Sequence, residues 1–302
     1  MNHLLKLTTL LLCLCVAVPA VQAQRKCSLQ TMAGTYAVYE KGSSSIVDLS
    51  VQPLPLHWAA GIAPFVNVAK ISFPPDGVGE GFYWIMIGSL NAGIEPIPLH
   101  VTITEMNPDC TGKFTYVANL PGGLSATVEE RFILFDNGRE YRSIPTSIVG
   151  GVPTLAWTGI GHRISKSSKP VNSCGPQTSH GTYLLDCESI DLLDPSAPNT
   201  AFANSLLFRV DISLTGDFTG TLYEKAGPAS IEIPVSGTVS VNSDCSFSST
   251  LNTPLPGTNL ERGIFFDQGK ELYMLPIVTV GPGLNDQRPE KYAFCQGKRI
   301  GQ

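Results

Sequence analysis

A Glu-Arg pair occurs twice in this chain and is the strongest candidate for chemistry. Glu130-Arg131 and Glu261-Arg262 each lie in an apolar run that is typical of a β-strand. Since neighbouring residues on a strand point to opposite faces, one charge of each pair must face an apolar interior. A buried Glu or Arg can orient a ligand or transfer a proton if its pKa is shifted. Glu130 and Arg131 are therefore the candidate catalytic residues, and a structural ion pair is the alternative.

Aromatic residues suggest a ligand cavity in the first half of the chain. Tyr83 and Trp84 are adjacent, and Trp58 and Trp157 complete the set of three tryptophans. Cavity walls are rich in aromatic side chains with a few polar groups. The predicted ligand-binding residues are Tyr83, Trp84, Trp58, Arg131 and Trp157, with plain core packing as the alternative. The apolar, proline-rich segment 50–65 is either a lid over the cavity or a packed loop.

The common catalytic and metal-binding signatures are absent from the sequence. It contains no G-x-S-x-G, H-E-x-x-H or P-loop motif, and no C-x-x-C pair. The histidines His57, His100, His162 and His180 are scattered, without the spacing of metal ligands. We therefore expect no metal and no cofactor, and whether the protein is an enzyme stays open.

The first residues have the order of a secretory signal peptide. An apolar run over residues 10–18 is too short to span a bilayer, and Val21-Gln22-Ala23 places small residues before a cleavage point. We predict a signal peptide over 1–23 and a secreted or periplasmic protein. No later run is apolar enough for a membrane span, and a net charge of −5 gives no basic surface for nucleic acid.

The remaining chain is an internal duplication. Cys27 and Cys174 each open the pattern C-x-x-Q-T-x-x-G-T-Y, and each copy ends on Gly-x-Arg-Ile at residues 161–164 and 297–300. Between these blocks, each copy has one Asp-Cys pair followed by one Glu-Arg pair. Four shared blocks predict two repeats, 24–165 and 166–302, joined by a polar linker over 165–172.

Both copies have the pattern of short antiparallel strands. Alternating apolar residues and turn signals predict strands over 66–72, 81–90, 99–106, 113–118, 126–135 and 140–144 in the first copy, and over 206–214, 218–224, 231–241, 259–266 and 271–278 in the second. Asn137-Gly138 predicts a two-residue hairpin turn. The fold class is therefore all-β, and each copy is either a sandwich or a closed barrel. We favour two tandem antiparallel β-barrels, because the end of each copy is expected to meet its beginning.

Six cysteines remain after the signal peptide, which in an exported chain predicts three disulfides. Cys187 and Cys295 have no counterparts in the first copy, so we expect them to pair with each other. The other four then form Cys27–Cys110 and Cys174–Cys245, one bond in each copy. The alternative, Cys27–Cys174 with Cys110–Cys245, would join the two copies.

The Gly-Thr-Tyr and Gly-x-Arg-Ile motifs of each copy resemble those of lipocalins and the wider calycin group. In that group an aromatic ring on the first strand packs on an arginine from the last strand and closes the barrel floor. The resemblance implies that Tyr36 contacts Arg163 and that Tyr183 contacts Arg299, although lipocalins carry Trp at the ring position. The allene-oxide-cyclase-like barrel is a second comparison, and no motif here selects it.

Three functional classes follow from these patterns. The first is an exported barrel that binds a small apolar molecule in repeat 1. The second is a barrel-type cyclase or isomerase that acts on a hydrophobic substrate. The third is a structural or adhesive envelope protein, which needs no cavity. The sequence leaves the oligomeric state undetermined.

Overall fold

The computed structural model describes residues 26–45, 62–87, 90–91, 95–120, 124–150, 154–166, 174–192, 201–226, 229–254, 258–280 and 291–301. The predicted signal peptide, Trp58 and most of the linker lie outside these residues. The repeat boundaries 24–165 and 166–302 therefore stay a prediction at their ends.

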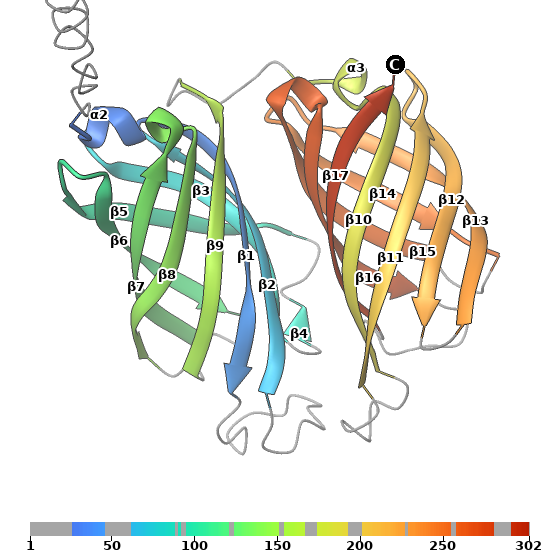
Figure 1. The fold of residues 1–302 in the computed structure, drawn as a ribbon, viewed down its shortest axis with the longest axis horizontal. Coiled ribbons are helices and arrows are strands. Elements are labelled where there is room, and N and C mark those ends of the chain that lie inside the picture. The colour runs from blue at the N-terminus through green and yellow to red at the C-terminus, as the bar shows by residue number, and fades with distance from the viewer. Residues whose placement is uncertain are drawn as a thin grey trace, which may run out of the picture.

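The first repeat forms an antiparallel barrel (Figure 1). Its strands are β1 (Gly34–Ser45), β2 (Ile62–Phe73), β3 (Val78–Ile87), β4 (Leu90–Asn91), β5 (Ile97–Met106), β6 (Thr111–Leu120), β7 (Leu124–Phe135), β8 (Glu140–Gly150) and β9 (Thr154–Ser165). They follow the order β2-β1-β9-β8-β7-β6-β5-β3-β4. Pairing of β2 with β3 closes a ring of eight strands, and the short strand β4 lies outside this ring.

The second repeat forms a closed barrel of eight strands, β10 to β17 in sequence order. These are β10 (Gly181–Leu192), β11 (Ala201–Ile212), β12 (Asp217–Ala226), β13 (Ala229–Val241), β14 (Ser246–Asn252), β15 (Thr258–Phe266), β16 (Glu271–Val280) and β17 (Lys291–Gly301). Short helices α2 (Leu29–Met32) and α3 (Pro176–Ser179) precede the first strand of each barrel. The prediction of two tandem antiparallel barrels is confirmed, and two eight-stranded rings fit a calycin-like fold.

The residues that motivated the calycin comparison lie at the closed end of each barrel. Tyr36 is opposite Arg163 on the neighbouring strand, and Tyr183 is opposite Arg299. The Tyr36 hydroxyl donates to the Gly138 carbonyl at 2.6 Å, and the Tyr183 hydroxyl donates to the Gly269 carbonyl at the same distance. The two floors are thus built by equivalent side chains.

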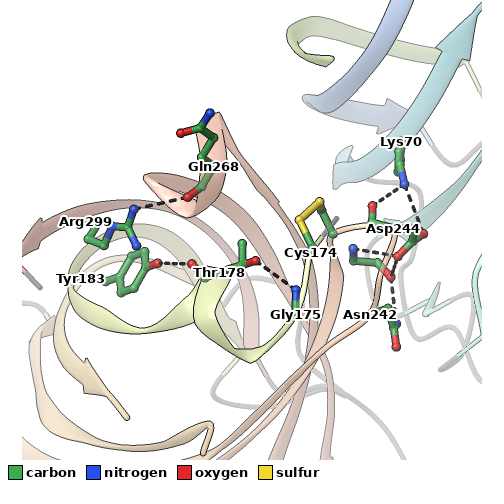
Figure 2. The surroundings of a disulfide bond; sticks show 11 residues. Lys70, Cys174, Gly175, Thr178, Tyr183, Asn242, Asp244, Gln268 and Arg299 are labelled. Atoms are coloured by element: carbon green, nitrogen blue, oxygen red, sulfur yellow. Dashed lines mark hydrogen bonds and ion pairs between the residues drawn. A yellow bond between two sulfur atoms is a disulfide. The ribbon is translucent and has the colours of Figure 1, made fainter. Parts of the chain in front are cut away.

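Each floor arginine connects the chain segment before the first strand to a distant hairpin. Arg163 donates to the carbonyls of Thr31 and Asn137, each at 3.0 Å. In the second barrel Arg299 donates to Gln268 at 3.3 Å, which Figure 2 shows beside Tyr183. A guanidinium has enough donors to hold both carbonyls at once. The floor therefore fixes the hairpin between β7 and β8, and its counterpart between β15 and β16, against the start of each barrel.

The hairpin at Asn137-Gly138 differs from the predicted two-residue turn. Phe135 pairs with Glu140, so the loop has four residues, and the 3-10 segment Asp136–Gly138 has positive φ throughout. Carbonyls of this loop accept the hydrogen bonds of Tyr36 and Arg163. The floor contacts thus favour a longer turn than the dipeptide alone predicts.

The structure contains the three disulfides that the repeat favours: Cys27–Cys110, Cys174–Cys245 and Cys187–Cys295. The first two each join the segment before a barrel to a turn between two strands. Cys187 and Cys295 face each other on β10 and β17. Their bond therefore links the first and last strands of the second barrel.

The two barrels pack side by side through an apolar interface. The interface residues of the first barrel are Ala37, Tyr39, Val68 and Trp84, and those of the second are Ile264, Phe266, Tyr273, Leu275 and Phe294. The ring of Tyr39 stacks on Phe294 with centroids 3.5 Å apart. Lys41 pairs with Glu188 at 2.8 Å at the edge of the interface.

We predict that replacing Cys187 and Cys295 together by Ala destabilises mainly the second barrel. The bond closes a loop with a sequence separation of 108 residues. The chain-entropy argument gives about 4–5 kcal/mol for loops on the order of a hundred residues. Urea denaturation checks this: circular dichroism should gain an earlier transition. Tryptophan fluorescence should change only in part in this transition, because Trp157 lies inside the first barrel whereas Trp84 is buried against the second. Unchanged circular dichroism midpoints would contradict the prediction.

Candidate ligand site in the first barrel

The two residues of the Glu130-Arg131 pair point in opposite directions, as alternation along β7 requires. Glu130 faces the interior of the barrel and is fully buried, with 0% relative exposure. Arg131 is exposed on the outer wall, where its strand neighbours are Lys113 and Ile144. Arg131 is therefore wrong both as a candidate catalytic residue and as a ligand-binding residue for the interior.

A second carboxyl group, Glu40 on β1, faces the same interior. Glu40 is 5% exposed, and it follows the inward-facing Tyr36 and Val38 at alternate positions of the strand. Its carboxyl group lies close enough to Glu130 for the two to interact electrostatically. The barrel thus brings together two carboxyl groups from strands that are not neighbours in the sheet.

Polar side chains from four other strands surround this pair. Tyr116 and the indole of Trp157 both donate to Glu130 Oε1, at 2.7 and 3.1 Å. Asn67 donates its amide nitrogen to Glu40 Oε2 at 3.0 Å. We call these five residues, together with the buried Tyr141 and Ser143 of β8, the carboxyl cluster.

Several buried polar atoms of the carboxyl cluster have no hydrogen-bond partner. They are Glu130 Oε2, Asn67 Oδ1, Tyr141 Oη and Ser143 Oγ. Most buried polar groups in folded proteins are paired, and leaving one unpaired costs roughly 1–3 kcal/mol. Ser143 and Glu40 still lower the pKa of Glu130 as hydrogen-bond partners, so Asn67 Oδ1 and Tyr141 Oη are the clearest unpaired atoms of the cluster.

Burial controls the protonation of the two carboxyl groups. Burial raises the pKa of Glu40 well above its ordinary value, and the negative charge of Glu130 raises it further. Burial also raises the pKa of Glu130, although the hydrogen bonds that it accepts oppose part of this effect. Two close carboxyl groups in a low-dielectric site do not both ionise easily, so the pair keeps a proton to higher pH than an isolated glutamate does.

A small cavity adjoins the carboxyl cluster. Its volume is about 30 Å³, roughly the room for one or two water molecules. Its polar side is lined by Glu40, Asn67, Tyr116 and Trp157, and its apolar side by Ala69, Ile71, Tyr83, Ile85, Leu99, Phe114, Ala118, Ala126 and Val128. Ala118 and Ala126 lie near the ends of β6 and β7, away from the floor that Tyr36 closes. The cavity therefore extends from Ile71, which pairs with the floor residue Tyr36, toward the opposite ends of the strands.

The predicted aromatic group divides between two environments. Tyr83 and Trp157 line the cavity. Trp84 points outward and is buried at 3% exposure in the interface between the barrels, so its prediction as a ligand-binding residue is wrong. Adjacent strand residues cannot share a face, which is why Tyr83 and Trp84 separate. Trp58 lies outside the described residues.

The sequence analysis missed most of the carboxyl cluster. Glu40, Asn67, Tyr116, Tyr141 and Ser143 belong to no shared motif. Period-two alternation from Tyr36 through Val38 was a signal that would have placed Glu40 inward. No comparable signal identifies Tyr116 or Ser143. Alternation indicates which face of a strand a residue occupies, and ordinary core residues show the same alternation.

The second barrel has replaced this cluster, as equivalent strand positions show. Cys187 occupies the position of Glu40, and Cys295 occupies that of Gly159. Asn67, Tyr116, Tyr141 and Ser143 are replaced by apolar residues, namely Leu206, Leu251, Leu272 and Met274. Only Glu261 remains, and it accepts a hydrogen bond from Ser249 at 2.5 Å. It lines a cavity of about 40 Å³ whose other walls are almost entirely apolar.

Among the described residues, no group of three or more His, Cys, Asp or Glu side chains has the arrangement of a metal site. Over the same part of the chain, no helix has the length and apolar character needed to cross a membrane.

Comparison with known proteins gives distant structural likenesses. No protein-family profile and no curated protein sequence matches the chain. Solved structures that resemble it include Transferrin Binding Protein B from Haemophilus parasuis Hp5, as a double mutant, at 8% identity and TM-score 0.30, covering 88% of this chain and 76% of that one. The isotype 1 Transferrin Binding Protein B from serogroup B Neisseria meningitidis has 11% identity and TM-score 0.29, with 89% and 76% covered.

A third similar structure is a protein of unknown function of the DUF3598 family from Nostoc punctiforme PCC 73102. It has 7% identity and TM-score 0.28, and the likeness covers 91% of this chain and 100% of that one. These scores assign the chain to none of these families.

We predict that the carboxyl cluster makes the first barrel less stable as the pH rises. The folded chain keeps protons on Glu40 and Glu130 at pH values where the unfolded chain has lost them. The stabilising protonation is complete below the ordinary glutamate pKa, about 4.3, and is lost as pH rises through the raised values. The free energy of unfolding should fall by about 1.4 kcal/mol per pH unit for each such proton.

Urea unfolding followed by tryptophan fluorescence at pH 5 and pH 8 measures this loss, and Glu40→Gln should reduce it. Glu261→Gln is the matched control, because burial raises the pKa of Glu261 to about 7 in the other barrel. That control should flatten the pH dependence of the circular dichroism transition and leave the fluorescence transition unchanged. A wild-type fluorescence transition that does not depend on pH would contradict the assignment.

Proposed function

We propose that this chain is an exported ligand-binding protein whose first barrel receives a small, mainly apolar molecule. A hydrogen-bonding head group of that molecule binds to the carboxyl cluster. The apolar cavity wall, from Ala69 and Ile85 to Val128, contacts the few ligand atoms next to that head group.

The observation that carries this proposal is the difference between the two barrels. The second barrel folds with a disulfide and apolar side chains where the first has Glu40, Asn67 and their neighbours. The fold therefore does not require a buried carboxyl pair. Burying such groups costs free energy unless every polar atom is paired. A cost that one copy has and the other avoids is explained most simply by binding.

The chemistry of the cluster limits the head group. Two polar residues that line the cavity, Glu40 and Asn67, carry hydrogen-bond acceptors, and Asn67 Oδ1 has no partner. A head group that donates hydrogen bonds, such as an alcohol or an amine, suits these acceptors. A carboxylate head group meets the charge of the pair and is disfavoured.

The volume of the cavity limits how much of the ligand it encloses. About 30 Å³ holds only a few atoms. The head group therefore occupies the cavity, and the rest of the molecule extends between the strand ends opposite the floor. Small sites of this type keep specificity through a few placed polar groups on an apolar wall.

An enzyme of the isomerase type is the second candidate, because the carboxyl pair combines an acid with a base. A carboxylic acid beside a carboxylate is the arrangement used to protonate one atom of a substrate and deprotonate another. In this function Glu40 and Glu130 would exchange one proton through the substrate. Turnover of a bound ligand, detected by mass spectrometry, distinguishes this function from binding alone.

Export is proposed on two grounds. Residues 1–23 have the pattern of a signal peptide, and three disulfides favour an oxidising compartment.

We predict that long-chain alcohols and amines displace a fluorescent long-chain alcohol from the protein, and that they compete better than fatty acids of the same length. Glu130→Gln should weaken the binding of the alcohols about tenfold or more, because it removes a charged acceptor. Native mass spectrometry of protein purified from its source should show a retained small molecule.

Two variants make the test specific. Glu40→Cys with Gly159→Cys copies the disulfide position of the second barrel, since these residues pair on β1 and β9 as Cys187 and Cys295 do on β10 and β17. It should keep the barrel folded and abolish the preference for alcohols and amines. Glu261→Gln should leave the affinities unchanged. The proposal fails if the wild type binds nothing in this panel, or if the double-cysteine variant binds as the wild type does.

A further inference from the structure

The contact between the two barrels uses different faces of the same fold. The first barrel contributes the outer face of β1, β2 and β3, and the second contributes the outer face of β15, β16 and β17. Because the barrels are copies, each one also carries the face that its partner uses. The chain therefore retains two further faces: the β10–β12 face of the second barrel and the β7–β8 face of the first.

The β10–β12 face of the second barrel is apolar at the positions that make contact in the first. Val68 pairs with Trp84 across β2 and β3, and their equivalents Leu207 and Tyr223 pair across β11 and β12. Leu207 is 46% exposed and Tyr223 is 39% exposed. Leu184 and Ile300, also exposed, occupy the positions of Ala37 and Ile164, which contact or flank the interface.

The β7–β8 face of the first barrel shows the complementary pattern. Ile264, Phe266 and Leu275 are buried in the interface between the barrels. Their equivalents are Ile133, Phe135 and Ile144, with exposures of 47%, 43% and 51%. Of the twelve large apolar side chains that the described residues leave exposed, seven thus lie at positions equivalent to interface positions.

The charges at the edges of these two faces are complementary as well. Lys70 pairs with Asp244 across the interface at 3.4 Å and also donates to the Asp244 carbonyl (Figure 2). The equivalent residues, Arg209 and Asp109, are both exposed. Asp109 accepts hydrogen bonds from Thr111 as Asp244 does from Ser246, so the turn holds both carboxylates alike.

One aromatic contact of the interface is replaced by a pair of opposite charges. Tyr39 contacts Tyr273 with ring centroids 5.7 Å apart. The equivalents are Asp186 on the second barrel and Arg142 on the first, and both are exposed. Because the two faces carry opposite charges at these positions, each face is complementary to the other face and not to a second copy of itself.

We propose that a second copy of this chain binds head to tail. The β10–β12 face of one chain contacts the β7–β8 face of the next and repeats the contact that joins the two barrels within each chain. Such a contact joins different faces, so repetition produces a closed ring or an open filament. The assembly continues the row of barrels that begins within a single chain.

Two disabled variants test the proposal in combination. Leu207→Asp blocks the second-barrel face, and Ile133→Asp blocks the first-barrel face. Sedimentation velocity over a wide concentration range should show association of the wild type and a single chain for each variant alone. An equal mixture of the two variants should form a complex of one chain of each, because one working interface remains between them.

A matched control and a charge exchange complete the test. Leu214, which is 60% exposed, lies on a turn of the same barrel outside the face, so Leu214→Asp should associate as the wild type does. Asp186→Arg and Arg142→Asp should each weaken association, and the double variant should restore it. Circular dichroism checks that each variant folds. A wild type that stays a single chain at every concentration overturns the proposal. So does a mixture of the two disabled variants that forms no complex.

Discussion

The closure of each barrel is the constraint on which the rest of the structure depends. The last strand returns to the first, β9 to β1 and β17 to β10, and a Tyr-Arg pair fastens the floor beside that seam. A closed sheet has no free edge, so its strands enclose an interior that side chains from every strand must share. This sharing brings Glu40 and Glu130 together, although neither strand pairs with the other. It also leaves the outer wall free to become a contact surface.

The two copies have different side chains at the same interior position. In the second barrel, a disulfide links the seam where the first barrel has Glu40 and Gly159, and apolar side chains fill the surrounding space. In the first barrel, the seam depends on strand pairing alone at this point, and buried polar atoms remain unpaired. The second copy thus has a covalent link at the position where the first copy has buried polar groups.

Much of the fold was predictable, because strand alternation and an internal repeat are local signals. The Cys187–Cys295 pairing followed from the absence of both residues in the first copy, and the barrel seam followed from Gly-Thr-Tyr and Gly-x-Arg-Ile. The site was predictable only in part. Tyr83 and Trp157, predicted to bind a ligand, line the cavity, and the candidate catalytic residue Glu130 faces the interior; their roles in binding and catalysis stay predictions. Arg131 and Trp84 were not, because the sequence alone did not decide which face of each strand was the inner one.

The sequence by itself determined the strands, the duplication and the cysteine pattern, since these depend on residues that are close along the chain or repeated in it. Only the tertiary structure decided that two carboxyl groups on separate strands lie close together in one interior, and that Trp84 contacts the other barrel. The reason is geometric: a barrel interior collects side chains by their height and facing direction. Closure of the whole ring fixes the height and the facing direction of each side chain, and no short stretch of sequence does so.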